Sequence, residues 1–109
     1  MAKVIHIENE EQFDEIIKGD KPAMIDFSAT WCGPCQMAAP IIDAIAETYK
    51  NTDKVAIAKI DIDGVRKVAT EYDVMSVPTF VYFKNGKEVS RVTGLRSQDE
   101  IEDTLDSLI

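Results

Sequence analysis

The sequence predicts a single α/β domain in which a mixed β-sheet of about five strands is flanked by about four helices. Segments with strand and helix periodicity alternate along all 109 residues without a repeat or linker. An Asn-Gly pair separates two strand-like segments near the C-terminus. Because a short hairpin is antiparallel and helical crossovers usually join parallel strands, one sheet with both kinds of pairing is expected over residues 1–109.

The first strand and helix are predicted close to the N-terminus. Residues 4–7 form a short apolar segment typical of a strand. Asn9 with Gln12 resembles a capping box, and Gly19 is expected to end the helix that it opens. The apolar face of that helix consists of Phe13, Ile16 and Ile17.

A central strand and a long helix follow. Residues 23–27 are apolar on both alternating faces except at Asp26, which is typical of a strand covered by helices on both sides. The next helix has helical spacing at Ala38, Ile41, Ile42, Ile45 and Tyr49. Pro40 lies within it and is expected to kink it, because proline removes one amide donor and crowds the preceding turn.

A second central strand is predicted over residues 55–60, again with one charge embedded, at Lys59. A short third helix is indicated by Val65, Val68, Ala69 and Tyr72. The predicted hairpin then joins residues 79–83 to residues 88–92. Ser97 opens the final amphipathic helix, whose apolar positions are Ile101, Leu105 and Leu108.

Composition narrows the classes of function. Twelve basic and twenty acidic residues give a formal net charge of −8, and an acidic surface repels phosphate backbones and anionic lipid. We therefore expect no nucleic-acid partner. No apolar segment has the length of a membrane helix, and the N-terminus lacks the pattern of a secretory signal. A monomer in the cytoplasm is expected.

The motif that carries chemistry is Cys32-Gly33-Pro34-Cys35, between a buried strand and a helix. Cysteines three residues apart in a first helical turn lie on one face, near the separation that a disulfide requires. The unpaired amides and positive dipole of a helix N-terminus favour a thiolate at Cys32. Pro34 needs no amide partner in that turn, so it preorganises the loop without losing a hydrogen bond.

Two other interpretations of the cysteines stay open. A structural zinc site needs about four ligands, and this chain offers two thiols and the distant His6, so such a site requires two copies of the chain. The pair could also be inert. A secreted scaffold spreads its cysteines through the chain, and this chain does not. Redox chemistry without a metal is the favoured interpretation.

The sequence resembles the thioredoxin family over essentially its whole length. The residues that carry the resemblance are 26–35, Pro40, 77–80 and Gly94. Because glutaredoxins and disulfide isomerases usually have other dipeptides between their cysteines, the Gly33-Pro34 pair resembles the reducing branch of the superfamily. Many bacterial members have tryptophan where this chain has Ser28, and serine is familiar there in other members. The resemblance implies a thioredoxin-like fold.

The resemblance implies a mechanism of disulfide exchange. Cys32 attacks a target disulfide, and Cys35 then attacks Cys32 and releases the reduced target. Cys35 needs a proton acceptor, and a carboxylate in an apolar strand should have a raised pKa, which makes Asp26 the candidate base. Asp26 could instead accept hydrogen bonds from local amides. Lys59 could pair with Asp26 and temper its pKa, or bury only its stem and extend its amine to solvent.

The resemblance also implies a docking surface for targets. In this family the proline that matches Pro78 is cis, which lets Val77 offer its backbone to an extended target segment. Trp31, Gly33, Val77 and Gly94 would form a flat, mostly apolar surface beside the cysteines. Trp31 could instead be ordinary core packing. His6 on the first strand is expected to be structural and receives no role.

The partners that the resemblance implies are a thioredoxin reductase and target proteins that contain disulfides. No bound cofactor is expected, because the dithiol is itself the two-electron carrier and no phosphate-binding glycine loop is present. No resident metal is expected. The alternative class of function is a binding module, in which the fold serves as an accessory subunit and the cysteines are dispensable.

Overall fold

The structure, a computed structural model, describes residues 3–109, and its elements follow the predicted order. The strands are β1 (Ile5–Ile7), β2 (Ala23–Ser28), β3 (Ala56–Asp61), β4 (Thr79–Lys84) and β5 (Lys87–Thr93). The helices are α1 (Glu10–Lys18), α2 (Gly33–Thr48), α3 (Arg66–Glu71) and α4 (Gln98–Leu108). α2 continues through Pro40, so the proline does not end the helix.

The strands form one mixed sheet in the order β1-β3-β2-β4-β5. β3 pairs in parallel with β1 and β2, while β4 pairs antiparallel with β2 and β5. The two strands predicted as central, β2 and β3, indeed have neighbours on both sides. The crossover through α3 departs from the usual parallel connection. β4 begins opposite Phe27, at the end of the sheet where β3 finishes opposite Ser28, so the chain re-enters the sheet at the end it left.

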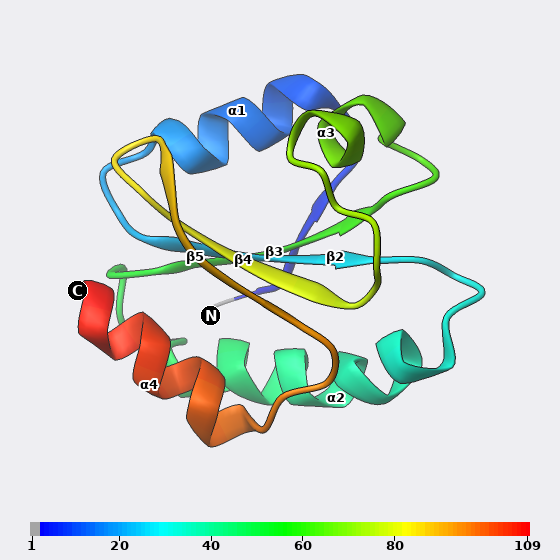
Figure 1. The fold of residues 1–109 in the computed structure, drawn as a ribbon. Helices are drawn as coiled ribbons and strands as arrows, with labels where there is room; N and C mark the ends of the chain where they lie inside the picture. The colour runs from blue at the N-terminus through cyan, green and yellow to red at the C-terminus, as the bar shows by residue number, and fades with distance from the viewer. Residues whose placement is uncertain (1–2) are drawn as a thin grey trace.

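Helices cover both faces of the sheet. α1 and α3 lie on one face and α2 and α4 on the other, as Figure 1 shows. Successive residues of β2 therefore enter different cores: Ile25 and Phe27 pack toward α1 and α3, and Met24 packs toward α2 and α4. Asp26 alternates with Ile25 and Phe27, so its side chain is on the α2 and α4 side.

Local chemistry sets the ends of several elements as predicted. The Asn9 side chain accepts a hydrogen bond from the Gln12 amide, and Ser97 does the same for Glu100, which satisfies amide donors that the first helical turn leaves open. Asn85 and Gly86 both have positive φ, as a two-residue hairpin requires. Within residues 3–109, no helix has the length and hydropathy needed to cross a membrane.

Candidate redox site

Cys32 and Cys35 lie where β2 gives way to α2, and they are joined by a disulfide. Their Cα atoms are 5.2 Å apart, within the range that a disulfide bridges. Cys32 is the N-cap of α2, and its Sγ accepts a hydrogen bond from the Cys35 amide at 3.2 Å. Pro34 stands in the first turn, where no amide donor is needed. The helix N-terminus therefore directs a donor and its positive dipole at the Cys32 sulfur.

The segment before β4 packs against the first cysteine. The Cys32 Sγ lies 3.6 Å from the Val77 carbonyl oxygen, and the Val77-Pro78 peptide bond is cis. The Gly94 amide donates to the Pro78 carbonyl at 2.8 Å, and Gly94 has a positive φ of 93°. Val77, Pro78 and Gly94, which are distant in sequence from the cysteines, therefore lie in one continuous strip beside them.

The two cysteines differ little in exposure. Cys32 is 5% exposed and Cys35 is 2% exposed, the order expected for a first and a second nucleophile. Ala29, Ile62 and Val77 pack around the pair.

Trp31 lies on the surface, so its interpretation as core packing is wrong. The side chain is 69% exposed, and its Nε1 donates a hydrogen bond to Asp63 at 2.8 Å, which fixes the ring at the edge of the site. Gly33 is also exposed, and a Cβ built there would have no atom of another described residue, its two chain neighbours and the nearby backbone of its own helix aside, within 4 Å. Packing within the molecule therefore does not require glycine at position 33.

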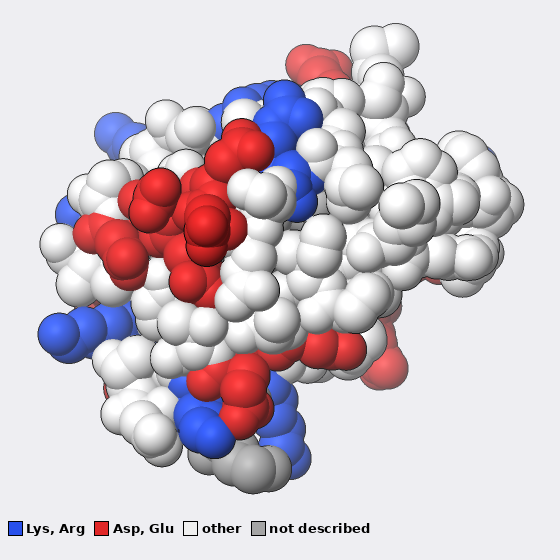
Figure 2. Space-filling view, turned by 90° about the horizontal axis from the view of Figure 1, so that it is seen from below, with Lys and Arg blue, Asp and Glu red and all other residues white. Residues whose placement is uncertain are grey.

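Two exposed methionines at this end were not among the sequence candidates. Met37 is 63% exposed on α2, and Met75 is 92% exposed in the segment that leads to Val77. Met37 falls outside the apolar stripe of its helix, a signal that could have identified it, whereas Met75 lies outside any periodic element. In Figure 2 the acidic side chains gather on the side of α4, while the end where α2 begins is mostly uncharged.

Asp26 is the buried charge of the site. It is 0% exposed, and neither carboxylate oxygen has a hydrogen-bond partner among the described residues. The interpretation that Asp26 satisfies local amides is therefore wrong. Loss of hydration raises the pKa of Asp26 from 3.8 to about 6, and the positive charge of Lys59 limits the rise. The carboxyl can thus exchange a proton close to neutral pH.

Lys59 faces Asp26 across the sheet without forming an ion pair with it. The two residues are register partners on β3 and β2, and no salt bridge joins them among the described residues. Lys59 is only partly buried. The charge of Lys59 therefore acts on Asp26 through space. The sequence had left open whether Lys59 pairs with Asp26 or extends its amine to solvent, and the structure lies between these two arrangements.

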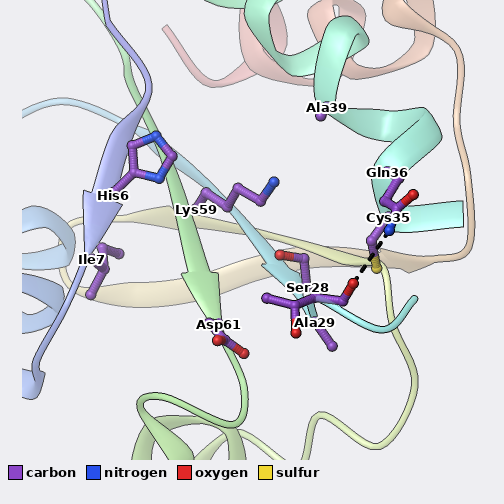
Figure 3. A pocket seen from close by; sticks show the side chains of 10 residues that line it. His6, Ile7, Ser28, Ala29, Cys35, Gln36, Ala39, Lys59 and Asp61 are labelled. Carbon is purple, nitrogen blue, oxygen red and sulfur yellow. Dashed lines mark hydrogen bonds between the residues drawn. The ribbon is translucent and has the colours of Figure 1, made fainter. Parts of the chain in front are cut away.

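A hollow of about 400 Å³ lies beside Cys35 on this face of the sheet. Cys35 from α2, Ser28 from β2, Lys59 and Asp61 from β3 and His6 from β1 are among its lining residues. In Figure 3 the Lys59 side chain extends from its strand toward the helix that carries Cys35, and His6 stands on the neighbouring strand. Cys35 therefore borders a hollow with titratable groups in its wall. Among residues 3–109, no group of three or more His, Cys, Asp or Glu side chains could hold a metal ion.

A family profile, related sequences and solved structures all match this chain to the same family. The sequence profile of the family described as Thioredoxin matches residues 3–107. Thioredoxin-2 of Saccharomyces cerevisiae is 44% identical over 92 residues, covering 84% of this chain and 86% of that protein. A bifunctional thioredoxin reductase/thioredoxin of Mycobacterium leprae is 36% identical over 94 residues, which cover 86% of this chain and 20% of that protein. The solved structure of Malassezia sympodialis thioredoxin superposes with a TM-score of 0.89 at 36% identity, covering 99% of this chain and 92% of that one.

Proposed function

The chain belongs to the thioredoxin family and is a protein-disulfide reductase, and we propose how the residues of its redox site divide the work. The single observation that carries the proposal is the Cys32–Cys35 pair at the start of α2 with a buried carboxyl, Asp26, on the same side of the sheet. Residues 1–109 act as one thioredoxin domain in this proposal.

Cys32 starts the reaction. In the reduced protein its sulfur sits at the helix N-cap, where the Cys35 amide and the helix dipole stabilise a thiolate. The thiolate attacks one sulfur of the target disulfide, so a Cys32–target bond forms and the second target sulfur leaves as a thiolate. Cys35 then attacks the Cys32 sulfur. The Cys32–Cys35 disulfide forms, the target leaves as a dithiol, and two electrons have moved from the protein to the target.

Asp26 receives the proton that Cys35 must lose before it attacks. The support is chemical and structural. A carboxylate with a pKa of about 6 and no hydrogen-bond partner within residues 3–109 is a competent base near neutral pH, and it lies on the face that α2 covers. Because the carboxyl is withdrawn from water, it gains more from a proton than an exposed aspartate does.

Trp31, Gly33, Val77 and Gly94 form the docking surface for targets, and Pro78, which is itself buried, sets the backbone next to Val77. The exposure of the large Trp31 ring favours contact with varied proteins. The open space above Gly33 suits close approach of a target backbone, since none of the residues that the structure describes occupies it. Val77 precedes β4 beside the Cys32 sulfur, where its backbone can pair with an extended target segment.

Gly33, Pro34 and Lys59 tune the redox reaction. Pro34 holds the first turn of α2, and Gly33 leaves the approach to Cys32 unobstructed. Lys59 keeps the pKa of Asp26 from rising further, so that the carboxyl can release its proton again.

The oxidised protein is recharged by a thioredoxin reductase. The Mycobacterium leprae relative, by its name, combines both activities in one polypeptide, which supports that partnership. The protein acts as a monomeric electron carrier in the cytoplasm on disulfide-containing proteins. A role as a binding module that does not need the cysteines is not favoured, because a nucleophile, a second thiol and a base are all present in one site.

The division of labour is tested by replacing each cysteine separately. With insulin as the target and a reductase to recharge the protein, Cys32→Ser should reduce insulin no faster than the background. Cys35→Ser should form a mixed disulfide with the target through Cys32 and then stall, because nothing resolves it. Mass spectrometry with and without a small thiol measures the trapped species. Equal trapping by both variants, or turnover without Cys32, contradicts the assignment.

A further inference from the structure

Three side chains form a row across the sheet from the buried base to the surface. Asp26 on β2 is the register partner of Lys59 on β3, and Lys59 is the register partner of His6 on β1. Register partners project from the same face of a sheet, so all three lie on the side that α2 and α4 cover. Asp26 is fully buried, Lys59 is partly buried and His6 is exposed. The row therefore leads outward from the redox site.

The hollow beside Cys35 follows the outer part of this row. Cys35, Lys59 and His6 all line it. A smaller hollow of about 200 Å³ shares His6 and Lys59 with it. Spaces of this size with several polar groups in the wall can hold water. A water-filled connection between the second cysteine and an exposed imidazole is thus compatible with the packing.

The proposed reaction requires such a connection. In each cycle Asp26 takes a proton from Cys35 and must then release it, although its oxygens have no contact with solvent and no hydrogen-bond partner among the described residues. An ammonium group such as that of Lys59 already carries its protons and favours the charged carboxylate. An imidazole, by contrast, both accepts and donates a proton near neutral pH.

We propose that His6 is the proton-exchange residue of this redox site, through which the proton taken up by Asp26 leaves for solvent. The inference rests on the proposed function of Asp26 as the base. The proton passes from the Cys35 thiol to the Asp26 carboxylate, then through water in the hollow past Lys59 to the His6 imidazole, and finally to solvent. Only a proton moves along the row, while the two electrons move through the sulfur atoms.

Other charged groups also face the imidazole. Lys59 and Asp61 of β3 line the first hollow with it, and Asp43 of α2 lines the smaller one. Asp43 is the matched control residue, because it is titratable and borders His6 but lies outside the register row.

The test is chemical rescue of a variant that lacks the imidazole. Insulin reduction is measured in the steady state with NADPH and a thioredoxin reductase, so that Asp26 must lose its proton again between cycles. His6→Ala should lower the steady-state rate at pH 7 by roughly tenfold, less than the 10²–10⁴-fold typical of a lost general base because water partly replaces it. Free imidazole should restore the rate, and the unmodified protein should not respond to imidazole. Asp43→Asn should behave as the unmodified protein.

The outcomes separate His6 from Asp26. An unchanged rate for His6→Ala, a loss that imidazole does not restore, or an equal loss in Asp43→Asn overturns the role of His6. Asp26→Asn is measured in parallel. If Asp26→Asn is slow while His6→Ala is not, the base stands and the exit route fails. If Asp26→Asn keeps the full rate, the proposed base itself is wrong and the route through His6 falls with it.

Discussion

The two faces of the sheet are formed by the same strands but carry different kinds of side chain. Toward α1 and α3 the buried side chains are apolar, and aromatic rings pack closely there: the Phe13 ring centroid lies 5.3 Å from that of Tyr72 and 5.6 Å from that of Phe83. Toward α2 and α4 the sheet carries an apolar core at one end, and at the other end Asp26, Lys59 and the hollow beside Cys35. The core on one face is apolar, whereas the other face carries titratable groups beside the redox site.

The difference between the two faces can be expressed in terms of the free energy of unfolding. Raising the pKa of Asp26 from 3.8 to about 6 corresponds to about 3 kcal/mol of lost stability above pH 6. Burying one phenylalanine contributes a similar amount, since truncating one typically costs about 3–5 kcal/mol. The apolar packing against α1 and α3 (the packed face) therefore offsets the stability that the buried charge of Asp26 costs on the face covered by α2 and α4 (the reactive face). Stability and reactivity can then be changed separately, and substitutions on each face test this.

The largest effect is expected from Phe13→Ala on the packed face. The ring is almost fully buried against Phe27, Tyr72 and Phe83, so its removal should lower the free energy of unfolding by about 3–5 kcal/mol. Denaturant midpoints should fall equally at pH 5 and pH 8, and turnover per folded molecule should stay unchanged. Phe13→Leu, which keeps most of the volume, should lose less. A loss that depends on pH would mean that the two faces are not independent.

The next effect is opposite in sign and lies on the reactive face. Between pH 3.8 and about 6 the native protein holds a proton on Asp26 that the unfolded chain has released, so stability falls as pH rises through that window and stays reduced above it. The free energy of unfolding of Asp26→Ala at pH 7 should therefore be about 1–3 kcal/mol higher than that of the unmodified protein, after allowance for a small cavity. The advantage should shrink toward pH 4. Turnover should fall by roughly 10²-fold or more, as is typical of a lost general base.

Denaturant midpoints across pH and a steady-state insulin assay measure both effects of Asp26→Ala. Asp43→Ala, which removes an exposed carboxylate from α2, is the control and should change stability by no more than about 0.5 kcal/mol. If Asp26→Ala is less stable at pH 7 and equally fast, Asp26 is a structural residue.

The smallest effect is expected from Lys59→Gln. Because the Lys59 charge lowers the pKa of Asp26, removing it should raise that pKa and move the pH dependence of turnover upward. Stability at pH 7 should fall by less than about 1 kcal/mol, since Lys59 is partly solvated and forms no ion pair with Asp26. Lys54→Gln at an exposed position is the control. A pH profile that moves downward, or that moves equally in both variants, would contradict the through-space effect of Lys59.

The sequence predicted the elements well because their signals are local. Alternation and helical spacing located every strand and helix, and Asn9, Ser97 and the Asn-Gly pair marked ends that the structure confirms. The Cys-Gly-Pro-Cys motif carried the identity of the redox site. The exposure of Trp31 was not determined, because one aromatic residue in a loop has no periodicity that distinguishes surface from core.

What the sequence by itself determined is the order of elements, the family and the position of the reactive cysteines, since each depends on residues near one another in the chain. Only the tertiary structure decided which groups face Asp26. Its missing hydrogen-bond partners, the through-space charge of Lys59 and the place of His6 at the outer end of the row follow from the pairing of β1, β3 and β2. The physical reason is that strand register sets which side chains from distant segments share one face, and burial then determines how strongly their charges act on one another.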